Sequence, residues 1–282
     1  MIVETVVSPE DPRLEPFRRV RDRDALGPDG RPGLFVGESP LVIEAMLRAP
    51  SVETIAVLAS ERQRGRAVEL IESSRSAGAV AVAPALLLAP DEVLNAVVGF
   101  DIHRGFLAVG RRPAARSVRE VVPPVPHDSL LLVVEEINNI DNIGQLFRNA
   151  AAFGCDAVLL SPGCHDPLYR KSLRVSCGHA LRVPFARSDS WDADLRWLVS
   201  EAGFALLGMT GGGELALRDA AVALRDAGTR RVAVLVGAEF SGLRPGTLAA
   251  CSHRVRIPMA EGVDSLNVGV AAGVVLSRFA ER

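Results

Sequence analysis

The C-terminal part of the chain alternates short apolar runs with longer amphipathic stretches, and this alternation limits its possible folds more than any other feature. The apolar runs have the composition of buried strands and lie at residues 130–134, 157–160, 204–207, 232–236 and 255–257. The stretches between and after them show helical spacing of apolar residues, at residues 142–153, 191–202, 217–226 and 265–279. Strands that alternate with helices form a parallel sheet covered by helices on both faces. We therefore predict an α/β fold for residues 128–282.

The N-terminal part shows a second, smaller alternation of the same kind. Strands are expected at residues 34–36, 54–58, 80–82 and 105–109, and helices at 40–48 and 60–76. Residues 111–127 are rich in proline, which fixes φ and removes backbone donors, so we interpret them as a linker. With 282 residues and 48% hydrophobic content, the chain can hold two cores. We predict a small α/β domain at 1–110, the linker at 111–127 and the parallel-sheet domain at 128–282.

The charge balance rules out a chain that attracts nucleic acid through an overall positive field. It has 32 basic and 34 acidic residues, a net charge of −2, and a single lysine, Lys171. Any contact with RNA must therefore come from local groups of arginines. Two such groups stand out, namely Arg13, Arg18, Arg19, Arg21 and Arg23, and then Arg170, Lys171, Arg174 and Arg182. For the first group, a solvated face is as good an interpretation as RNA contact.

Features of membrane, secreted and metal-binding proteins are missing from the sequence. No apolar run reaches the length of a membrane span, and the N-terminus lacks a basic segment before an apolar one, so we expect a cytoplasmic protein without a membrane partner. The four cysteines are then expected to be reduced thiols. Two of them stand near histidines, at Cys164-His165 and Cys177-x-His179, but without paired metal-ligand spacing. We predict no metal site.

The stretch from residue 142 to 154 reads as a helix with two polar side chains in unusual places. Its apolar residues fall at helical spacing, at Ile143, Leu146, Phe147 and Ala150. Asn142 stands at its start, Arg148 lies off the apolar stripe, and Gly154 is a natural end. A buried helix with one solvated arginine is the alternative.

Two later segments also place polar groups at the ends of expected strands. The strand at 232–236 ends at Gly237, and Glu239 follows two residues later, where an open α/β sheet has its ligand crevice. After the strand at 255–257, Ser265 and Asn267 open an otherwise apolar helix. Polar groups at a helix N-terminus suit a polar or anionic ligand. The alternatives are a solvated Glu239 and a helix that Asp264 or Ser265 simply caps.

Together these three segments resemble the SpoU/TrmH family of RNA ribose 2′-O-methyltransferases, which belongs to the SPOUT class. Its first motif, Asn-x-Gly-x3-Arg and later Phe-Gly, is met by Asn142, Gly144, Arg148, Phe153 and Gly154. Its second motif, Gly-x-Glu-x-x-Gly after a strand, is met by Gly237, Glu239 and Gly242. Its third motif is met by Ile257-Pro258-Met259 and Ser265-Leu266-Asn267-Val268. The likeness covers residues 128–282, and it departs from the family at Ile140-Asp141, where Asp-Pro is usual.

The resemblance implies an S-adenosylmethionine-dependent enzyme that methylates a ribose 2′-hydroxyl of tRNA or rRNA, with a trefoil knot in its C-terminal domain. The catalytic residues it implies are Arg148, Asn142, Glu239, Ser265 and Asn267. The cofactor-binding residues it implies are Thr210, Gly237, Ile257, Met259 and Leu266. A family segment near the cofactor cleft is similar to Arg174-x-Ser176-x-Gly178, which makes Arg174 and Ser176 candidate RNA contacts.

The resemblance also implies partners. The pattern of Leu34 to Glu38, with His103-Arg104-Gly105 later, is similar to a substrate-binding domain that precedes many SpoU domains and resembles small ribosomal RNA-binding proteins. In this family a two-fold interface built by the last helix and the helix after the first motif completes the active site, and the apolar helix at 265–279 fits a homodimer. Burial of this helix under the N-terminal domain is the alternative. Two alternatives stay open, a non-catalytic RNA-binding protein of the same fold and a SPOUT enzyme that methylates a base.

The chemistry of the guanidinium group limits the role that Arg148 can have in the reaction. The family resemblance implies that it activates the 2′-hydroxyl, yet a guanidinium is very hard to deprotonate. We therefore expect Arg148 to orient and polarise the hydroxyl or an adjacent phosphate, with the route of the proton left open.

Overall fold

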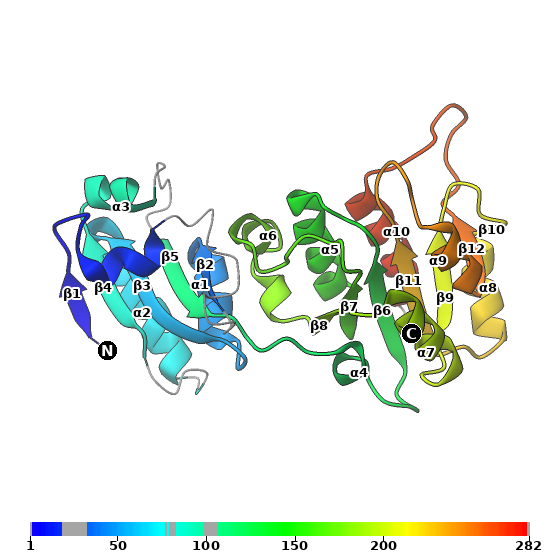
Figure 1. Cartoon of the computed structure of the whole chain (residues 1–282), viewed down its shortest axis with the longest axis horizontal. Coiled ribbons are helices and arrows are strands. Elements are labelled where there is room, and N and C mark those ends of the chain that lie inside the picture. The colour runs from blue at the N-terminus through cyan, green and yellow to red at the C-terminus, as the bar shows by residue number, and fades with distance from the viewer. Residues whose placement is uncertain (1, 19–32, 77, 79–82, 99–105, 281–282) are drawn as a thin grey trace. The chain divides into compact units, whose positions relative to one another are not determined.

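The computed structural model describes residues 2–18, 33–76, 78, 83–98 and 106–280 (Figure 1). The chain divides into two compact units. The first consists of Met1–Ala114 and Pro167–Arg182, and the second of Ala115–Asp166 and Val183–Arg282.

A seven-stranded sheet, parallel throughout, forms the centre of the second unit. Its strand order is β10-β12-β9-β11-β6-β7-β8. The strands are β6 (Ser129–Val134), β7 (Ala157–Leu160), β8 (Phe185–Arg187), β9 (Ala205–Met209), β10 (Leu215–Ala216), β11 (Arg231–Val236) and β12 (His253–Arg256). The central strands β6 and β11 are buried over their whole length, as expected for a parallel sheet covered on both faces. The predicted α/β fold with a parallel sheet is confirmed.

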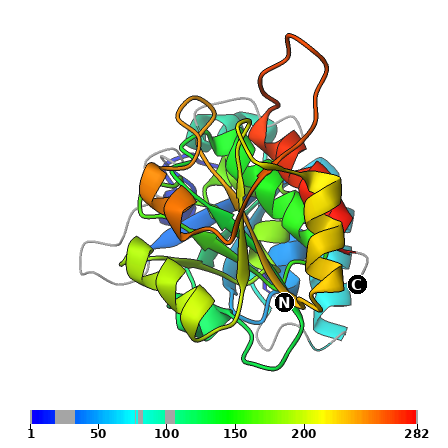
Figure 2. The ribbon, with the colours of Figure 1, turned by 90° about the vertical axis from the view of Figure 1, so that its right-hand side faces the viewer.

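Helices cover both faces of this sheet (Figure 2). One face carries α5 (Ile140–Ala152), α8 (Leu217–Asp226) and α10 (Val268–Ala280), and the other carries α4 (Val118–Val121), α7 (Trp191–Ser200) and α9 (Pro245–Ala250). On the second face, Val118, Trp191 and Leu195 share one apolar cluster with Leu131 and Leu235 of the strands. Burial of these side chains is the main force that holds the helices on the sheet.

The first unit contains a five-stranded mixed sheet of order β1-β4-β3-β5-β2. Its strands are β1 (Val3–Thr5), β2 (Leu34–Glu38), β3 (Glu53–Ser60), β4 (Ala85–Ala89) and β5 (Phe106–Arg111). Its helices are α1 (Pro40–Arg48), α2 (Arg64–Ser76), α3 (Asp91–Val98) and α6 (Arg170–Val175), with 3-10 turns at η1 (Pro12–Phe17), η2 (Glu61–Gln63) and η3 (His179–Leu181). The strand expected at 80–82 and the His103 motif lie outside the described residues.

The division differs from the predicted boundaries at two places, each with a physical reason. The proline-rich segment up to residue 127 belongs to the second unit, because the buried Arg231 donates hydrogen bonds to the carbonyls of Pro123, Pro124 and His127. The segment Pro167–Arg182 belongs to the first unit, because Arg170 and Arg174 both pair with Glu38.

Candidate functional site

Three loops of the second unit emerge at the same edge of its sheet. They follow β9, β11 and β12, which are adjacent strands, and they comprise residues 210–214, 237–244 and 257–267. The strands are parallel, so their carboxyl ends meet, and ligands of open α/β sheets bind outside that edge. All predicted catalytic and cofactor-binding residues except Asn142 and Arg148 lie in these loops.

Asn142 enters this edge from the first turn of α5. The side chain of Asn139 caps the helix by accepting hydrogen bonds from the backbone N–H groups of Asp141 and Asn142, so α5 begins before the predicted residue 142. Asn142 is 2% exposed, and its Nδ2 donates to Glu239 Oε1 at 2.7 Å. The helix and the loop after β11 are thereby joined side chain to side chain.

Asn267 completes a cluster of three polar residues. Its Oδ1 accepts hydrogen bonds from the backbone N–H groups of Gly269 and Val270, so its Nδ2 must face the other way. That Nδ2 donates to Asn142 Oδ1 at 2.9 Å and to Glu239 Oε1 at 3.2 Å. Backbone N–H groups can only donate, so they fix the orientation of the Asn267 amide. The Asn267 Nδ2 donor then fixes the orientation of the Asn142 amide.

The start of α10 corrects the prediction for this helix. The helix begins at Val268 instead of residue 265, and the capping side chain is Asn267 instead of Asp264 or Ser265. The physical reason is that Asn267 caps α10 while it also bonds Asn142 and Glu239, so one residue sets both the helix start and the cluster.

Close backbone approaches hold the loop after β11 in a tight bend. A Cβ atom at Gly237 would lie 2.3 Å from the carbonyl carbon and 2.4 Å from the carbonyl oxygen of Gly242. The bend closes with a hydrogen bond of 2.8 Å from the Gly242 N–H to the Ala238 carbonyl, and Gly242 has a φ of +64°. Only glycine fits Gly237 without moving backbone, and this places Glu239 at the tip of a rigid loop.

A buried carboxylate that the sequence analysis missed anchors the far side of this loop. Glu135 is fully buried and accepts hydrogen bonds from Arg244 and from the Thr247 hydroxyl, the latter at 3.0 Å. Trp191 Nε1 donates to the same hydroxyl at 3.2 Å. The only sequence signal for this buried carboxylate was a pair of glutamates at the end of a strand. Its hydrogen-bond partners lie more than 50 residues further along the chain, so the sequence did not indicate them.

Helices α5 and α10 pack closely beside the cluster. Asn149 Nδ2 donates to the Gly269 carbonyl at 2.6 Å, and a Cβ at Gly269 would lie 2.3 Å from Gln145 Oε1. The short residue at position 269 lets the two helices approach, and the bond from Asn149 fixes their register. Asn149 and Gln145 therefore support the site from the second and third turns of α5.

The loop after β9 lies against β12 and against the segment that follows it. The Thr210 N–H donates to the Val255 carbonyl at 3.0 Å, and a Cβ at Gly213 would lie 2.6 Å from the carbonyl carbon of Val255. A Cβ at Gly211 would lie 3.7 Å from the Asp264 carbonyl oxygen. Ile257 and Met259 are half-buried here, and Leu266 is 38% exposed. Thr210, Ile257 and the segment up to Asp264 therefore form one side of the site.

Arg148 and Ser265 stand outside the hydrogen-bonded cluster. Both are exposed, and neither side chain forms a hydrogen bond or ion pair with any residue that the structure describes. Arg148 is six residues after Asn142 on α5, which is about 9 Å along the helix axis. The structure thus brings together Asn142, Glu239 and Asn267 and leaves the Arg148 guanidinium free to meet a ligand.

The predicted RNA contacts belong to the first unit. Arg174 pairs with Glu38 at 3.0 Å and stays 42% exposed. Ser176 is fully buried, and its hydroxyl donates to the Leu173 carbonyl at 3.1 Å, so it supports the end of α6 and offers no side-chain surface to RNA in this conformation.

The N-terminal arginine group is partly neutralised. Arg13 pairs with Glu4 and Asp11, and Arg18 pairs with Glu15. Arg19, Arg21 and Arg23 lie outside the described residues.

The thiol of Cys251, which packs against β9, is held in its neutral form. Burial, and then the nearby Glu135 carboxylate, raise the pKa of Cys251 to about 12. Its Sγ packs under β9, where a Cβ at Gly208 would lie 2.7 Å from it. Among the described residues, no three His, Cys, Asp or Glu side chains are placed to hold a metal ion, and no helix is long and apolar enough to cross a membrane.

Comparison with known proteins gives consistent matches. Residues 129–277 match the SpoU rRNA Methylase family. The chain is 40% identical to an uncharacterized tRNA/rRNA methyltransferase of Mycobacterium bovis, over 96% of this chain and 90% of that protein. Its fold is similar to a solved RNA 2′-O ribose methyltransferase, with 28% identity, a TM-score of 0.74 and 97% of each chain covered. An AdoMet-bound rRNA methyltransferase from Sinorhizobium meliloti shares the fold at 21% identity, with a TM-score of 0.75 over 98% of this chain and 97% of that one.

Proposed function

The chain belongs to the SpoU rRNA Methylase family, and we propose that it transfers a methyl group from S-adenosylmethionine to a ribose 2′-hydroxyl of tRNA or rRNA. That it is an RNA methyltransferase follows from the family; the choice of the ribose is the proposal. The main support for this proposal is the cluster of Asn142, Glu239 and Asn267 at the carboxyl edge of the sheet. Arg148, on the same helix as Asn142, adds a guanidinium with no partner among the described residues. The solved relative named an RNA 2′-O ribose methyltransferase supports the same choice.

The loops after β9, β11 and β12 fit S-adenosylmethionine. When bound, this cofactor supplies an electrophilic methyl group on a positively charged sulfur. Thr210, Gly237, Ile257, Met259 and Leu266 would hold it, mostly through backbone groups and apolar contact. Their fit rests on the bend at Gly237, which has no room for a side chain, and on the partial exposure of Ile257 and Leu266 beside it.

Glu239 would hold the substrate in place from a fixed loop. Its Oε1 is occupied by the amides of Asn142 and Asn267, whereas its Oε2 has no hydrogen bond to a described residue. A free carboxylate oxygen accepts a hydrogen bond from a hydroxyl. Such a contact orients the nucleophile, and correct placement of two reacting groups supplies a large part of the rate of a transfer reaction.

Arg148 would bind the substrate's phosphate or polarise its hydroxyl. Its guanidinium is exposed and unpaired among the described residues, and the planar group matches a phosphate with two parallel hydrogen bonds. Ser265 would add a further hydroxyl from the exposed loop before α10.

RNA contact is supported by an exposed aromatic side chain beside the cluster. Phe240 follows Glu239, and its side chain is fully exposed, at 103%. It is the only aromatic residue among the exposed large hydrophobic residues that the structure describes. Single-stranded RNA is commonly held by stacking of bases on aromatic rings. We propose that the first unit, including Arg174, supplies further RNA contact.

A homodimer is part of the proposal. Val270 and Val274 lie one turn apart on α10 and are 51% and 41% exposed. Exposed apolar side chains in a row mark an association surface, and a symmetric dimer is the commonest way to cover one. A partner on this face of α10 would also lie near α5, which carries Arg148.

Two further features of the family are proposed for this chain. A trefoil knot would pass the segment after β12 through the loop region after β9, which agrees with the approach of Gly211 to Asp264 of that segment. A cytoplasmic location agrees with four cysteines that are all free.

The test compares ribose and base methylation directly. The full-length protein is incubated with S-adenosylmethionine and unmodified tRNA and rRNA, and the nucleosides are analysed by mass spectrometry. A methyl group on the ribose fragment supports the proposal. A methyl group on the base fragment supports the base-methylating alternative, and no transfer with intact RNA binding supports the non-catalytic one.

A further inference from the structure

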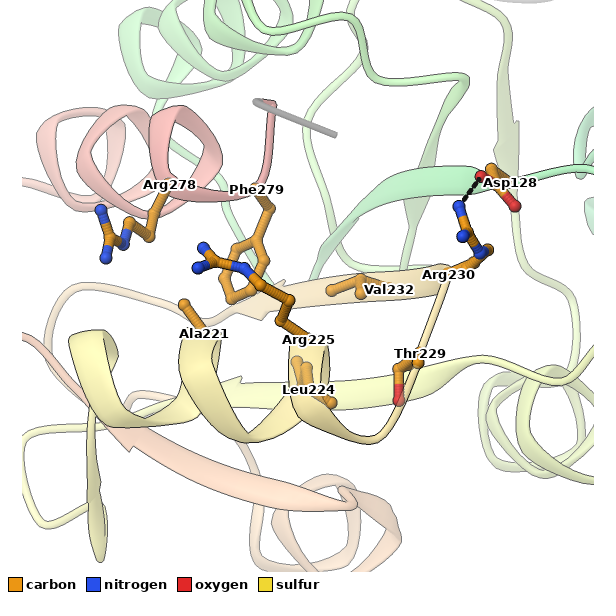
Figure 3. Close-up of a pocket in the computed structure, with 10 residues that line it drawn as sticks. Asp128, Ala221, Leu224, Arg225, Thr229, Arg230, Val232, Arg278 and Phe279 are labelled. Atoms are coloured by element: carbon orange, nitrogen blue, oxygen red, sulfur yellow. Dashed lines mark hydrogen bonds and ion pairs between the residues drawn. The ribbon is translucent and has the colours of Figure 1, made fainter.

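A pocket lies at the opposite edge of the same sheet, away from the loops of the candidate site. It has a volume of about 290 Å³ and is formed where α8 ends, where β11 begins and where α10 ends (Figure 3). Val232 lines it near the start of β11, whereas the cluster follows Val236 at the other end of that strand. At about 3.3 Å per residue, the two sites are separated by roughly 15 Å along the strand.

The floor of this pocket is apolar. Leu224, Val232 and Phe279 line it, and each is at most 9% exposed. Their side chains belong to the packing between α8, β11 and α10, so the floor is fixed by the core of the unit. An apolar floor of this kind suits an organic ring more than a hydrated ion.

The rim carries three guanidinium groups and one carboxylate. Arg230 is paired with Asp128 at 3.1 Å. The guanidinium groups of Arg225 and Arg278 are exposed and form no ion pair or hydrogen bond with a described residue. Figure 3 shows Arg225 and Arg278 on one side of the pocket beside Phe279, with Arg230 and Asp128 at its other end.

A contribution to helix stability explains only part of the placement of Arg225 and Arg278. Arg225 and Arg278 each stand in the last turn of a helix, where a cation is favoured by the helix dipole. That explains a positive charge at each helix end, but both arginines also line one pocket with an apolar floor, and no carboxylate of a described residue pairs with either of them. An anion at the rim would pair with these guanidinium groups, and a ring on the floor would use the apolar surface below.

We propose that this pocket is an accessory RNA site that takes one nucleotide of the substrate, with its phosphate at Arg225 and Arg278 and its base against the floor. The inference rests on the proposed RNA substrate. The pocket would hold the RNA at a distance from the methylated ribose, and it would supply local positive charge to a chain with a net charge of −2. A phosphate contact positions RNA without reading its sequence, so the pocket contributes affinity more than target choice.

The test measures RNA affinity of the full-length protein as a function of salt. Arg225→Gln and Arg278→Gln are compared with Arg218→Gln, an exposed arginine on α8 that does not line the pocket. Each pocket variant should bind RNA about threefold to tenfold more weakly and lower the salt slope by about 1. The control should keep both values, and all variants should keep cofactor affinity. Loss of the helix-end charge should lower the melting temperature of each pocket variant by no more than roughly 1–4 °C.

A fourth variant tests the same site by a gain of binding, which misfolding cannot produce. Asp128→Asn removes the carboxylate that neutralises Arg230, so it should tighten RNA binding and raise the salt slope. Wild-type affinity in both pocket variants would overturn the proposal, and so would an equal loss in Arg218→Gln. A wild-type protein that binds no RNA would instead overturn the proposed function on which the pocket rests.

Discussion

Substitution of Gly237 by alanine should damage both stability and catalysis, because the new Cβ would meet backbone atoms instead of side chains. The nearest are Gly242 C, Gly242 O and Leu243 N, at 2.3, 2.4 and 2.5 Å. Ordinary contact distances are about 1 Å longer, so the loop after β11 has to move by that amount. Overpacking costs about 1–3 kcal/mol, and we expect about 3 here, since backbone cannot change rotamer.

The size of the two effects can be estimated. For a domain of this length, about 3 kcal/mol lowers the melting temperature by roughly 6–12 °C. Glu239 lies two residues beyond the substitution, and a displacement of about 1 Å at a reacting group costs on the order of a hundredfold in rate. Methyl transfer should therefore fall about a hundredfold even at a temperature where the variant is fully folded.

Gly246→Ala is the matched control. Gly246 lies in α9, has a helical φ and has no atom within 4 Å of its ideal Cβ position. Alanine there should raise stability by about 0.5–1 kcal/mol, or roughly 1–4 °C, with unchanged activity. Thermal unfolding and single-turnover methyl transfer measure both. A Gly237→Ala protein that melts and reacts like the wild type would refute the account of the rigid loop.

Three further outcomes are expected. Arg148→Ala and Arg148→Lys should both lower the rate of methyl transfer at least about a hundredfold, because a lysine lacks the planar N–H donors of a guanidinium. Both variants should keep their cofactor affinity in calorimetry. Near-normal turnover of the lysine variant would mean that a positive charge alone suffices. Val274→Glu should convert a dimer to a monomer in light scattering, since it places a charge in the exposed apolar row of α10, and an unchanged mass would place the interface elsewhere. The pKa of Cys251 is raised from about 9 to about 12, so the folded protein keeps a proton there that the unfolded chain releases. The contribution of this thiol to the free energy of unfolding is therefore full below pH 9 and is lost as the pH rises toward 12. Cys251→Ala should accordingly flatten the fall of stability over that pH range in urea titrations.

The sequence was sufficient for features that depend on neighbouring residues. The strand at 130–134 is found as Ser129–Val134, and the family indicated by the three motifs is confirmed by the match over residues 129–277. Helix starts were less predictable, because Asn139 and Asn267 cap α5 and α10 through geometry that the residue types alone do not specify. Asn, Asp and Ser are all good caps, so a run containing several of them leaves the choice open.

Contacts between distant residues could not be predicted from one sequence. Glu38 pairs with Arg170, which is 132 residues away, and this pair joins the segment Pro167–Arg182 to the first unit. Arg231 reaches Pro123 over 108 residues and holds the proline-rich segment on the second unit. Composition marked that segment as a linker, whereas it contains the short helix α4, and composition carried no signal of the buried arginine that holds the segment.

One measurement tests the central claim most directly. Methylation of the ribose 2′-hydroxyl blocks alkaline cleavage of the adjacent phosphodiester, whereas methylation of a base leaves that cleavage intact. The full-length protein is incubated with methyl-labelled S-adenosylmethionine and unmodified RNA, and the RNA is then hydrolysed completely in alkali. The account predicts that the label appears in alkali-stable dinucleotides and that Glu239→Gln greatly reduces it. Label found only in mononucleotides would contradict transfer to the ribose.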